Sequence, residues 1–290
     1  MFSLAKILLP VDFSQRALGA ARYAEALAKQ HGAEVTMLHI IPPPHYEFAS
    51  MEAGSTALAE LYANRKTVIE EESRNFLVAE LPDFKPKRVL LEGDPAREVV
   101  RFAHENAFDL IVMPTHGYGP FRRFVLGSVT AKVLHDADCP IWTGVHLQEA
   151  PATGEIQFKT ILCAVDLGPL SEKALTWASQ FAAAANAKLL VVHATPSLEG
   201  RTGEYFDPDW RVYLAKQAQE RIDELQAKIG TTAEVVIDAG DAPRVVEAAA
   251  KKLNADLVVI GRGSASGVFG RLRANAYAII RQSPCPVVSV

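Results

Sequence analysis

Ile7-Leu-Leu-Pro-Val-Asp12 recurs in the second half of the chain as Ile161-Leu-Cys-Ala-Val-Asp166. Each copy is a short apolar run that ends in aspartate, which is typical of a buried strand that stops at the polar edge of a sheet. Other pairs of segments recur in the same order, so the sequence indicates a duplicated domain. They are Glu34–Ile40 with Lys188–Ala194, Gly93–Arg97 with Gly240–Arg244, Asp109–Met113 with Asp256–Ile260, and Cys139–Ile141 with Cys285–Val287.

The length of the chain agrees with a duplication. With 290 residues, each half is long enough to form a core of its own, because domains commonly contain roughly 100 to 200 residues. The stretch from Gln148 to Gly154 is polar and contains proline and glycine, so it is predicted to be a linker. We therefore expect domains over residues 1–147 and 155–290.

The arrangement of apolar segments predicts an α/β fold. In each half, short β-branched runs alternate with longer segments of helical period, which is the pattern of βαβ units and a parallel sheet. The expected fold is two tandem, doubly wound parallel sheets, each of five strands in the order 3-2-1-4-5. In the first half the expected strands cover residues 6–12, 34–41, 88–92, 109–114 and 140–145, and the expected helices cover 15–31, 56–80, 95–107 and 126–136.

Two local patterns refine this expectation. Ser14 and Asp94 stand where they can cap the first and third of these helices. In the second half, apolar residues at every third or fourth position predict one core-facing stripe on a long helix. The residues of this stripe are Trp210, Leu214, Ala218, Ile222, Leu225 and Ile229.

The composition argues against several classes of protein. The net charge is −4, and in neither half do basic residues outnumber acidic ones, so nucleic-acid binding is not expected. The amino-terminal residues contain no basic leader and no long apolar stretch, so we expect a cytoplasmic protein without a membrane anchor. Cys139, Cys163 and Cys285 show no metal-ligand or redox spacing and are expected to be reduced and buried.

A glycine-containing loop follows the fourth strand of the first half. The run Met113-Pro-Thr-His-Gly-Tyr-Gly-Pro-Phe-Arg-Arg-Phe-Val-Leu-Gly-Ser-Val129 carries Arg122 and Arg123 but no acid. Such a loop at the start of a helix brings backbone N–H groups close to an anion. In the order 3-2-1-4-5 a ligand crevice lies between strands one and four, so Asp12 and this loop are expected to line it together.

These features resemble the universal stress protein family, whose nucleotide-binding members carry Gly-x-x-Gly-x9-Gly-Ser/Thr after the fourth strand. Residues 114–128 fit that spacing, with Pro114 in place of the first glycine. The resemblance implies a Rossmann-like fold of the adenine nucleotide alpha hydrolase-like type, with ATP or a related adenine nucleotide, with or without magnesium, in the first half. It implies a site of Pro10, Val11 and Asp12 at the nucleoside, Ile40 at the adenine edge, Met113 near base and ribose, His116 beside the loop, and Gly117, Gly127, Ser128 and Val129 at the phosphates.

Some of these residues have a second interpretation. Asp12 can instead accept hydrogen bonds from backbone N–H groups in the turn after the strand. His116 can donate to a phosphate or assist hydrolysis, but no carboxylate is paired with it in the sequence, which favours a polar loop residue over a catalyst. His39 and His193 end equivalent strands, which favours a shared structural role.

The second half departs from the loop pattern. Arg273 and Ala274 stand where the first half has its Gly-Ser pair, and Gly261 stands where it has Pro114. Because an arginine side chain keeps a phosphate away from the backbone, we expect weak, altered or absent nucleotide binding in this half. Asp166 would then be a relic or a residue of the helix start. The candidate anion contacts in this half are Arg262, Arg271 and Arg273.

For function, the resemblance implies a cytoplasmic, nucleotide-responsive regulatory or stress-survival factor. The sequence contains no nucleophile elbow, zinc helix or Walker A motif, so no dedicated catalysis is expected. A nucleotide-independent interaction module and a slow ATP-hydrolysing enzyme stay open as alternatives. Related single-domain proteins dimerise through the last strand, so an internal pseudo-dimer through the strands ending at Val145 and Val290 is expected, and a homodimer stays open as well.

Overall fold

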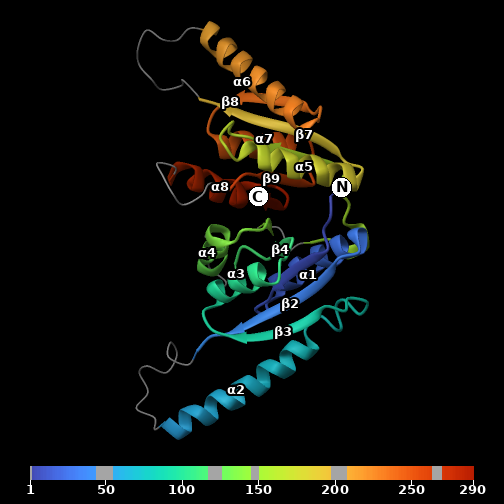
Figure 1. Ribbon diagram of the computed structural model, residues 1–290, viewed down its shortest axis with the longest axis vertical. Coiled ribbons are helices and arrows are strands. Elements are labelled where there is room, and N and C mark those ends of the chain that lie inside the picture. The colour runs from blue at the N-terminus through green and yellow to red at the C-terminus, as the bar shows by residue number, and fades with distance from the viewer. Residues whose placement is uncertain (1, 44–54, 117–125, 145–149, 197–207, 263–269) are drawn as a thin grey trace. The chain divides into compact units, whose positions relative to one another are not determined.

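The computed structural model describes residues 2–43, 55–116, 126–144, 150–196, 208–262 and 270–290 (Figure 1). The chain forms two compact units. The N-terminal unit contains Ser3–Ile141 and Leu147–Ile156, and the C-terminal unit contains Met1–Phe2, Trp142–His146 and Gln157–Val290. The chain is therefore not divided between the units at a single point.

The N-terminal unit has the expected α/β architecture. Its strands follow the order β3-β2-β1-β4, with β5 next to β4, and β1 pairs in parallel with both β2 and β4. The elements are β1 (Lys6–Pro10), α1 (Gln15–His31), β2 (Glu34–Ile41), α2 (Ser55–Asn75), β3 (Lys87–Glu92), α3 (Pro95–Glu105), β4 (Leu110–Val112) and α4 (Ser128–Asp136). The next strand, β5 (Ile141–Thr143), begins in this unit with Ile141, and its other residues belong to the C-terminal unit.

The C-terminal unit repeats this architecture. Its strands follow the order β8-β7-β6-β9-β10, and all neighbouring pairs are parallel, so the predicted order is found here as well. The elements are β6 (Thr160–Ala164), α5 (Ser171–Ala185), β7 (Lys188–Thr195), α6 (Pro208–Ile229), β8 (Glu234–Ala239), α7 (Ala242–Lys252), β9 (Leu257–Ile260), α8 (Gly270–Gln282) and β10 (Val287–Ser289). Between Ala152 and Gln157 lies a short 3-10 turn, η3 (Thr153–Glu155).

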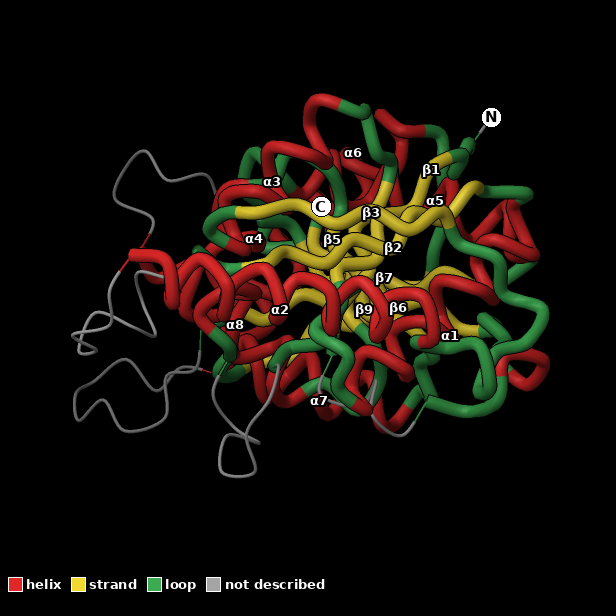
Figure 2. Tube along the Cα trace, turned by 90° about the horizontal axis from the view of Figure 1, so that it is seen from below, coloured by secondary structure: helices red, strands yellow, loops and turns green. Residues whose placement is uncertain are grey.

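Burial explains why the duplicated apolar runs form the central strands. Ile7, Leu8 and Leu9 of β1 are fully buried, and so are the residues of β6 from Ile161 to Cys163. Strands of a parallel sheet are covered on both faces, which favours continuous apolar sequence over alternation. Figure 2 accordingly shows the strands running between helices.

The strands are shorter than predicted at their carboxyl ends. β1 ends at Pro10 and β4 at Val112, whereas the sequence pattern extended them to residues 12 and 114. Asp12 and Met113 therefore lie just beyond the strands, in the loops that carry ligand sites in this class of fold. The same holds for Asp166, which follows the end of β6 at Ala164.

The two predicted helix caps have different outcomes. The side chain of Asp94 accepts a hydrogen bond from the backbone N–H of Arg97 at 2.9 Å, which confirms it as the cap of α3. Ser14 occupies the N-cap position of α1 but makes no side-chain cap hydrogen bond. Its hydroxyl instead donates to Oδ1 of Asp12 at 2.6 Å, so the predicted capping bond of Ser14 is wrong.

The apolar stripe on α6 is only partly a core. Ala218 and Ile222 are buried, as predicted. Trp210 is 46% exposed, so its placement in the core is wrong. Its ring instead stacks on that of Tyr213, with centroids 5.3 Å apart. None of the helices that the structure describes is both long and apolar enough to span a membrane.

The cysteines are free thiols, as expected. Cys163 and Cys285 are buried, and burial raises the pKa of both thiols, that of Cys285 to about 12. Cys139 is only partly buried, so the expectation of burial holds for two of the three.

Aromatic residues from outside the second repeat complete the core of the C-terminal unit. Trp142 is fully buried, and its ring centroid lies 5.3 Å from that of Phe158 and 6.0 Å from that of Phe181. Phe2 packs edge-on against Trp177 at 5.6 Å and against Phe181 at 5.7 Å. The first repeat thus supplies two aromatic side chains to the unit formed by the second.

The linker between the repeats is bonded to the N-terminal unit. The guanidinium of Arg22 in α1 donates to the carbonyl oxygen of Ala150 at 2.6 Å. The hydroxyl of Thr153 donates to Oε2 of Glu25 at 2.5 Å, and Glu25 is buried. The segment between the repeats is therefore fixed to the N-terminal unit by side chains of its first helix.

Candidate functional site

The candidate site of the N-terminal unit lies where strand order changes direction. β1 pairs in parallel with β2 on one side and with β4 on the other. Because β1 and β4 are parallel neighbours, the residues that follow them leave the same edge of the sheet. Asp12 and the segment that begins at Met113 therefore lie at the switch point where ligands of doubly wound folds bind.

Asp12 shapes the turn that leads into α1. Its Oδ1 accepts hydrogen bonds from the backbone N–H of Ser14 at 3.1 Å and from the hydroxyl of Ser14 at 2.6 Å. This is the turn role that the sequence left open. In the part of the chain that the structure describes, Oδ2 has no such hydrogen bond, so one carboxylate oxygen stays available while the other holds the turn.

His39 and Phe13 form one wall beside Asp12. Nδ1 of His39 lies 2.8 Å from the carbonyl oxygen of Val11, and the Phe13 ring stacks on the imidazole with centroids 4.3 Å apart. Since a carbonyl oxygen only accepts, Nδ1 carries the proton. Burial lowers the pKa of His39, which favours the neutral ring. The structural role expected for His39 is therefore observed.

Phe13 is a residue of the wall that the sequence did not reveal. Its φ is +60°, in the left-handed region that non-glycine residues rarely adopt. Leu167, at the same place in the second repeat, has a φ of +59°. Glycine and asparagine are the usual signals for this conformation, and neither stands at these positions. Only the equivalence of the two turns could have suggested it.

The end of β4 is bonded to the beginning of α4. The hydroxyl of Thr130 donates to the carbonyl oxygen of Pro114 at 3.1 Å, and the N–H of Gly127 donates to that of Thr115 at 2.8 Å. His116 is buried, with Nδ1 2.8 Å from the hydroxyl oxygen of Thr115. His116 is thus a loop residue, as expected, but a buried one.

Gly127 contributes by the absence of a side chain. A Cβ atom at this position would lie 3.2 Å from the carbonyl oxygen of Thr115 and 3.5 Å from Cα of His116. Its N–H is already bonded to Thr115, so it is not the amide that meets an anion. The first turn of α4 instead offers the amides of Ser128, Val129 and Thr130, which have no carbonyl partner within the helix.

The remaining predicted loop residues, Gly117, Arg122 and Arg123, lie outside the described residues. The other predicted site residues all follow or end strands of the same edge or begin α4. Pro10 ends β1, Val11 and Asp12 follow it, Ile40 lies at the end of β2, Met113 follows β4, and Ser128 and Val129 begin α4.

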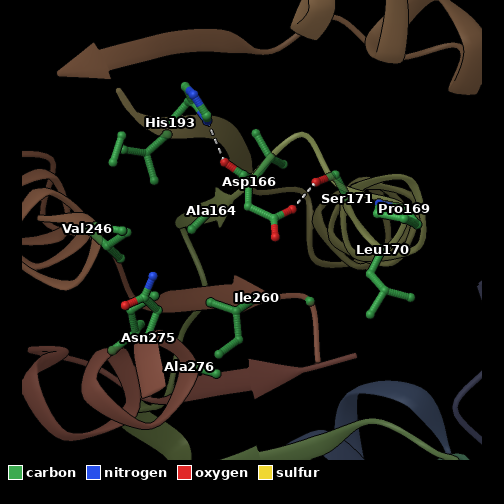
Figure 3. Close-up of a pocket in the computed structure, with 16 residues that line it drawn as sticks. Ala164, Asp166, Pro169, Leu170, Ser171, His193, Val246, Ile260, Asn275 and Ala276 are labelled. Carbon is green, nitrogen blue, oxygen red and sulfur yellow. Dashed lines mark hydrogen bonds between the residues drawn. The ribbon is translucent and has the colours of Figure 1, made fainter. Parts of the chain in front are cut away.

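In the C-terminal unit, the same edge holds a cavity of about 320 Å³ (Figure 3). Its lining includes the counterparts in the second repeat of Pro10, Val11, Asp12, Ile40, Met113 and Val129. These counterparts are Ala164, Val165, Asp166, Ala194, Ile260 and Asn275. The location predicted for a ligand in the first repeat is thus a real hollow in the second, although the second half was expected to bind nucleotide weakly or not at all.

The polar groups around this cavity repeat those of the N-terminal unit. Oδ1 of Asp166 accepts from the N–H of Gly168 at 2.9 Å and from the hydroxyl of Ser171 at 2.8 Å. Nδ1 of His193 lies 2.8 Å from the carbonyl oxygen of Val165. Asp166 therefore binds the start of α5, which is one of the two roles expected for it, and His193 has the structural role of His39.

The two repeats differ at the helix that follows the loop. α4 begins at Ser128, whereas α8 begins at Gly270, ahead of Arg273 and Ala274. The positions that correspond to Gly127 and Ser128 therefore lie inside α8. Arg271 and Arg273 belong to this first part of the helix, and where their side chains lie is outside the described part of the structure.

Known proteins resemble this chain in sequence and in fold. The profile of the Universal stress protein family matches residues 4–143 and again 157–290. Two universal stress proteins of Methanocaldococcus jannaschii are 34% identical over 141 residues and 31% identical over 148 residues; each alignment covers 47% of this chain and 79% or 91% of the relative. The crystal structure of a universal stress protein from Archaeoglobus fulgidus matches with a TM-score of 0.65 at 22% identity, over 99% of this chain and 96% of that one.

The last of these similarities supports the fold alone, whereas the two matches of the family profile assign both halves of the sequence. The duplicated strand order and the duplicated turns at Asp12 and Asp166 agree with that assignment. The chain belongs to the universal stress protein family and carries two domains of that family in tandem.

Proposed function

We propose that the N-terminal unit binds ATP or a related adenine nucleotide and that the protein acts as a nucleotide-responsive factor in stress survival. The observation that carries this proposal is the start of α4 at Ser128, directly after Gly127, where a Cβ atom would lie only 3.2 Å from the carbonyl oxygen of Thr115. The site would lie between the ends of β1 and β4. Membership of the family supports the stress-related role.

Electrostatics favour a phosphate at α4. The first turn of this helix contains no acidic residue, and its free N–H groups carry the positive end of the helix dipole. The exposed hydroxyl of Ser128 adds a further donor. Thr130 and Gly127 fix the helix start to the loop after β4, so these donors are held in place before a ligand arrives.

Asp12 supports the nucleoside end. Oδ1 is committed to Ser14, so the orientation of the carboxylate is fixed, and Oδ2 can accept a hydrogen bond from a ribose hydroxyl or an exocyclic amine. The neighbouring wall of His39 and Phe13 is aromatic and held by the bond to Val11. The hydrogen-bond donors at the start of α4 thus suit the phosphate end of a nucleotide, and the acceptor at Asp12 suits its nucleoside end.

Calorimetry with ATP, ADP and AMP on a Ser128→Glu variant tests the phosphate end. Glutamate in the first turn suits the helix dipole, so α4 should form, but its charge repels a phosphate and the serine donor is lost. We expect ATP affinity to fall at least tenfold, with a smaller loss for AMP because it carries less charge.

The matched control is Ala274→Glu, which introduces the same charge at the equivalent position of the second repeat. It should leave ATP affinity unchanged. Equal ATP binding by Ser128→Glu and the unaltered protein would overturn the site, and a loss confined to Ala274→Glu would move it to the C-terminal unit. Release and mass identification of any nucleotide that copurifies with the intact protein would identify the natural ligand.

A further inference from the structure

We infer that the cavity of the C-terminal unit is a separate site for an uncharged molecule of nucleoside size, and that it excludes nucleotides. Its volume of about 320 Å³ lies within the range of small-molecule sites, roughly 300 to 1,000 Å³. The lining residues belong to the C-terminal unit alone, so the inference does not rest on the nucleotide site proposed for the N-terminal unit.

Apolar side chains form most of the wall. Val246 of α7 stands on one side, Leu170 at the start of α5 on the other, and Ile260 at the end of β9 lies between them (Figure 3). Three positions have smaller or shorter side chains than their counterparts in the first repeat: Ala164 for Pro10, Ala194 for Ile40, and Ile260 for Met113. At these three positions the side chains of the second repeat therefore extend less far from the backbone than those of the first.

A small number of polar groups converge on this space. The Asp166 carboxylate lies in the middle of the lining residues, with Oδ1 bonded to Ser171 (Figure 3). The same oxygen accepts from the N–H of Gly168. Its second oxygen can accept a hydrogen bond from a ligand. Nδ1 of His193 donates to Val165, so the other ring nitrogen is an acceptor when the imidazole is neutral. The Asn275 amide adds a donor and an acceptor.

The charge of the lining opposes an anion. Asp166 is the only aspartate, glutamate, lysine or arginine among the lining residues that the structure describes. Among these described lining residues, a phosphorylated ligand would therefore meet a carboxylate and no compensating cation. Charged groups taken from water without a partner are strongly disfavoured, whereas a hydroxyl or amine donor gains a charge-assisted hydrogen bond from Asp166.

The backbone of α8 also lacks the donors that a phosphate needs at this place. Asn275 corresponds to Val129 in the first turn of α4, but α8 already begins at Gly270. In an α-helix the N–H at position i bonds to the carbonyl at i−4, so the amide of Asn275 is directed to residue 271 and not to the cavity. The earlier start of α8 thus removes at this position the amides that α4 offers in the N-terminal unit.

Methyl NMR of the intact protein can observe the two sites separately. The isoleucine methyls of Ile260 and Ile279 line the cavity, and their counterparts in the first repeat are Met113 and Val133. Ile40 lies at the edge proposed for the nucleotide, where the second repeat has Ala194. Isoleucine labelling therefore reports each site through signals that the other lacks.

The probes are adenosine, AMP and ATP. Adenosine should shift the Ile260 and Ile279 methyl signals in a saturable manner, with affinity at least tenfold above those of AMP and ATP at the same signals. Adenosine that leaves both signals unmoved, or ATP that shifts them as effectively, would overturn the inference. Failure of ATP to shift Ile40 would count against the proposed nucleotide site of the N-terminal unit and not against this one.

Asp166→Asn is the matched test of the acceptor. The asparagine retains an oxygen for Gly168 and Ser171 but replaces the second oxygen by an amide donor, so the turn should persist while adenosine affinity at Ile260 falls at least tenfold. The control is Asp12→Asn, which makes the same change in the first repeat and should leave the response of Ile260 unaltered. Equal adenosine affinity in the Asp166→Asn protein would contradict the role of the carboxylate.

Ala276→Leu provides a steric test that does not involve charge. Ala276 lines the cavity from α8 and is only partly buried, so a larger side chain can enter the open space. Adenosine should no longer shift Ile260, while ATP should still shift Ile40. Retained adenosine binding at Ile260 would show that the ligand lies elsewhere.

Discussion

Nδ1 of His39 lies 2.8 Å from the carbonyl oxygen of Val11, the residue just before Asp12. This bond ties the end of β2 to the turn after β1, and His193 makes the same bond to Val165 in the second repeat. Because the imidazole is held beside each carboxylate-bearing turn, it limits the conformations of the backbone that presents Asp12 and Asp166.

His39 should make folding stability depend on pH. Burial lowers its pKa, partly opposed by the hydrogen bond to Val11, so the unfolded chain binds the proton more readily than the folded one. The contribution of His39 to the free energy of unfolding is then fully present above the unfolded pKa of about 6.5. It is lost as the pH falls from there towards the folded pKa. Urea unfolding between pH 5 and 8 should show this loss, with a slope of at most about 1.4 kcal/mol per pH unit from this residue.

A His39→Gln variant should flatten that slope. The flattening is expected to be partial, because burial lowers the pKa of His31 as well. A double variant that also carries His31→Gln should be flatter again. The same slope in the single variant and the unaltered protein would contradict the assignment to His39.

Trp142→Ala should destabilise the C-terminal unit, although the residue is encoded in the first repeat. The side chain is fully buried against Phe158 and Phe181, and truncation of such a residue typically costs about 3–5 kcal/mol. The measurement is urea unfolding followed by hydrogen exchange in β6 and α5. Trp210→Ala is the matched control, since Trp210 is 46% exposed and its loss should have little effect. Similar losses for both tryptophans would rule out the packing described for Trp142.

Gly127→Ala should disturb the junction between β4 and α4. The new Cβ would lie 3.2 Å from the carbonyl oxygen of Thr115, so the loop or the helix start must shift. We expect a loss of about 1–3 kcal/mol in the free energy of unfolding, typical of overpacking, together with weaker ATP binding. Gly154→Ala is the control, because no atom lies within 4 Å of the position of its Cβ. If Gly127→Ala is as stable as Gly154→Ala and binds ATP normally, the close packing has no energetic consequence.

Arg88→Met should loosen α2 from the sheet. The guanidinium of Arg88 donates to the carbonyl oxygens of Ser73 and Phe76 at the end of that helix. Hydrogen bonds from a charged donor contribute about 1.5–3 kcal/mol each, and their loss leaves part-buried carbonyls without this donor. Hydrogen exchange near Ser73 should accelerate.

Arg101→Met is the control for Arg88. Arg101 pairs with Glu98 and Glu105 on an exposed helix face, where solvent screens the charges and ion pairs contribute little to stability. Equal effects of the two substitutions would show that Arg88 is no more than a surface cation.

Much of the fold could be predicted because the repeats carry strong apolar patterns. Continuous runs such as Ile7–Leu9 identified the central strands, and the expected strand order came from the doubly wound class of fold. The helix expected over residues 126–136 was found as α4, which begins two residues later, at Ser128. These features depend on local sequence and on rules of connection that hold for all doubly wound sheets.

The remaining features depend on contacts between distant residues. Nothing near Trp142 in the sequence indicates that it packs on Phe158 and Phe181, because the two repeats look self-contained when read separately. The burial of His116 and the left-handed backbone of Phe13 are likewise fixed by tertiary packing. The early start of α8 at Gly270 could not be predicted by counting from the first repeat, because the two loops differ in sequence and length.

The exchange of aromatic residues between the repeats restricts how such a gene can evolve after duplication. A second repeat cut from the chain at the linker would leave behind Trp142, which is fully buried in the C-terminal unit, and Phe2, which packs against Phe181. The separated domain would have a cavity in its core, whereas loss or substitution of loop residues leaves the core intact. The second repeat therefore needs to stay in one chain with the first, whereas the ligand preferences of the two repeats can diverge.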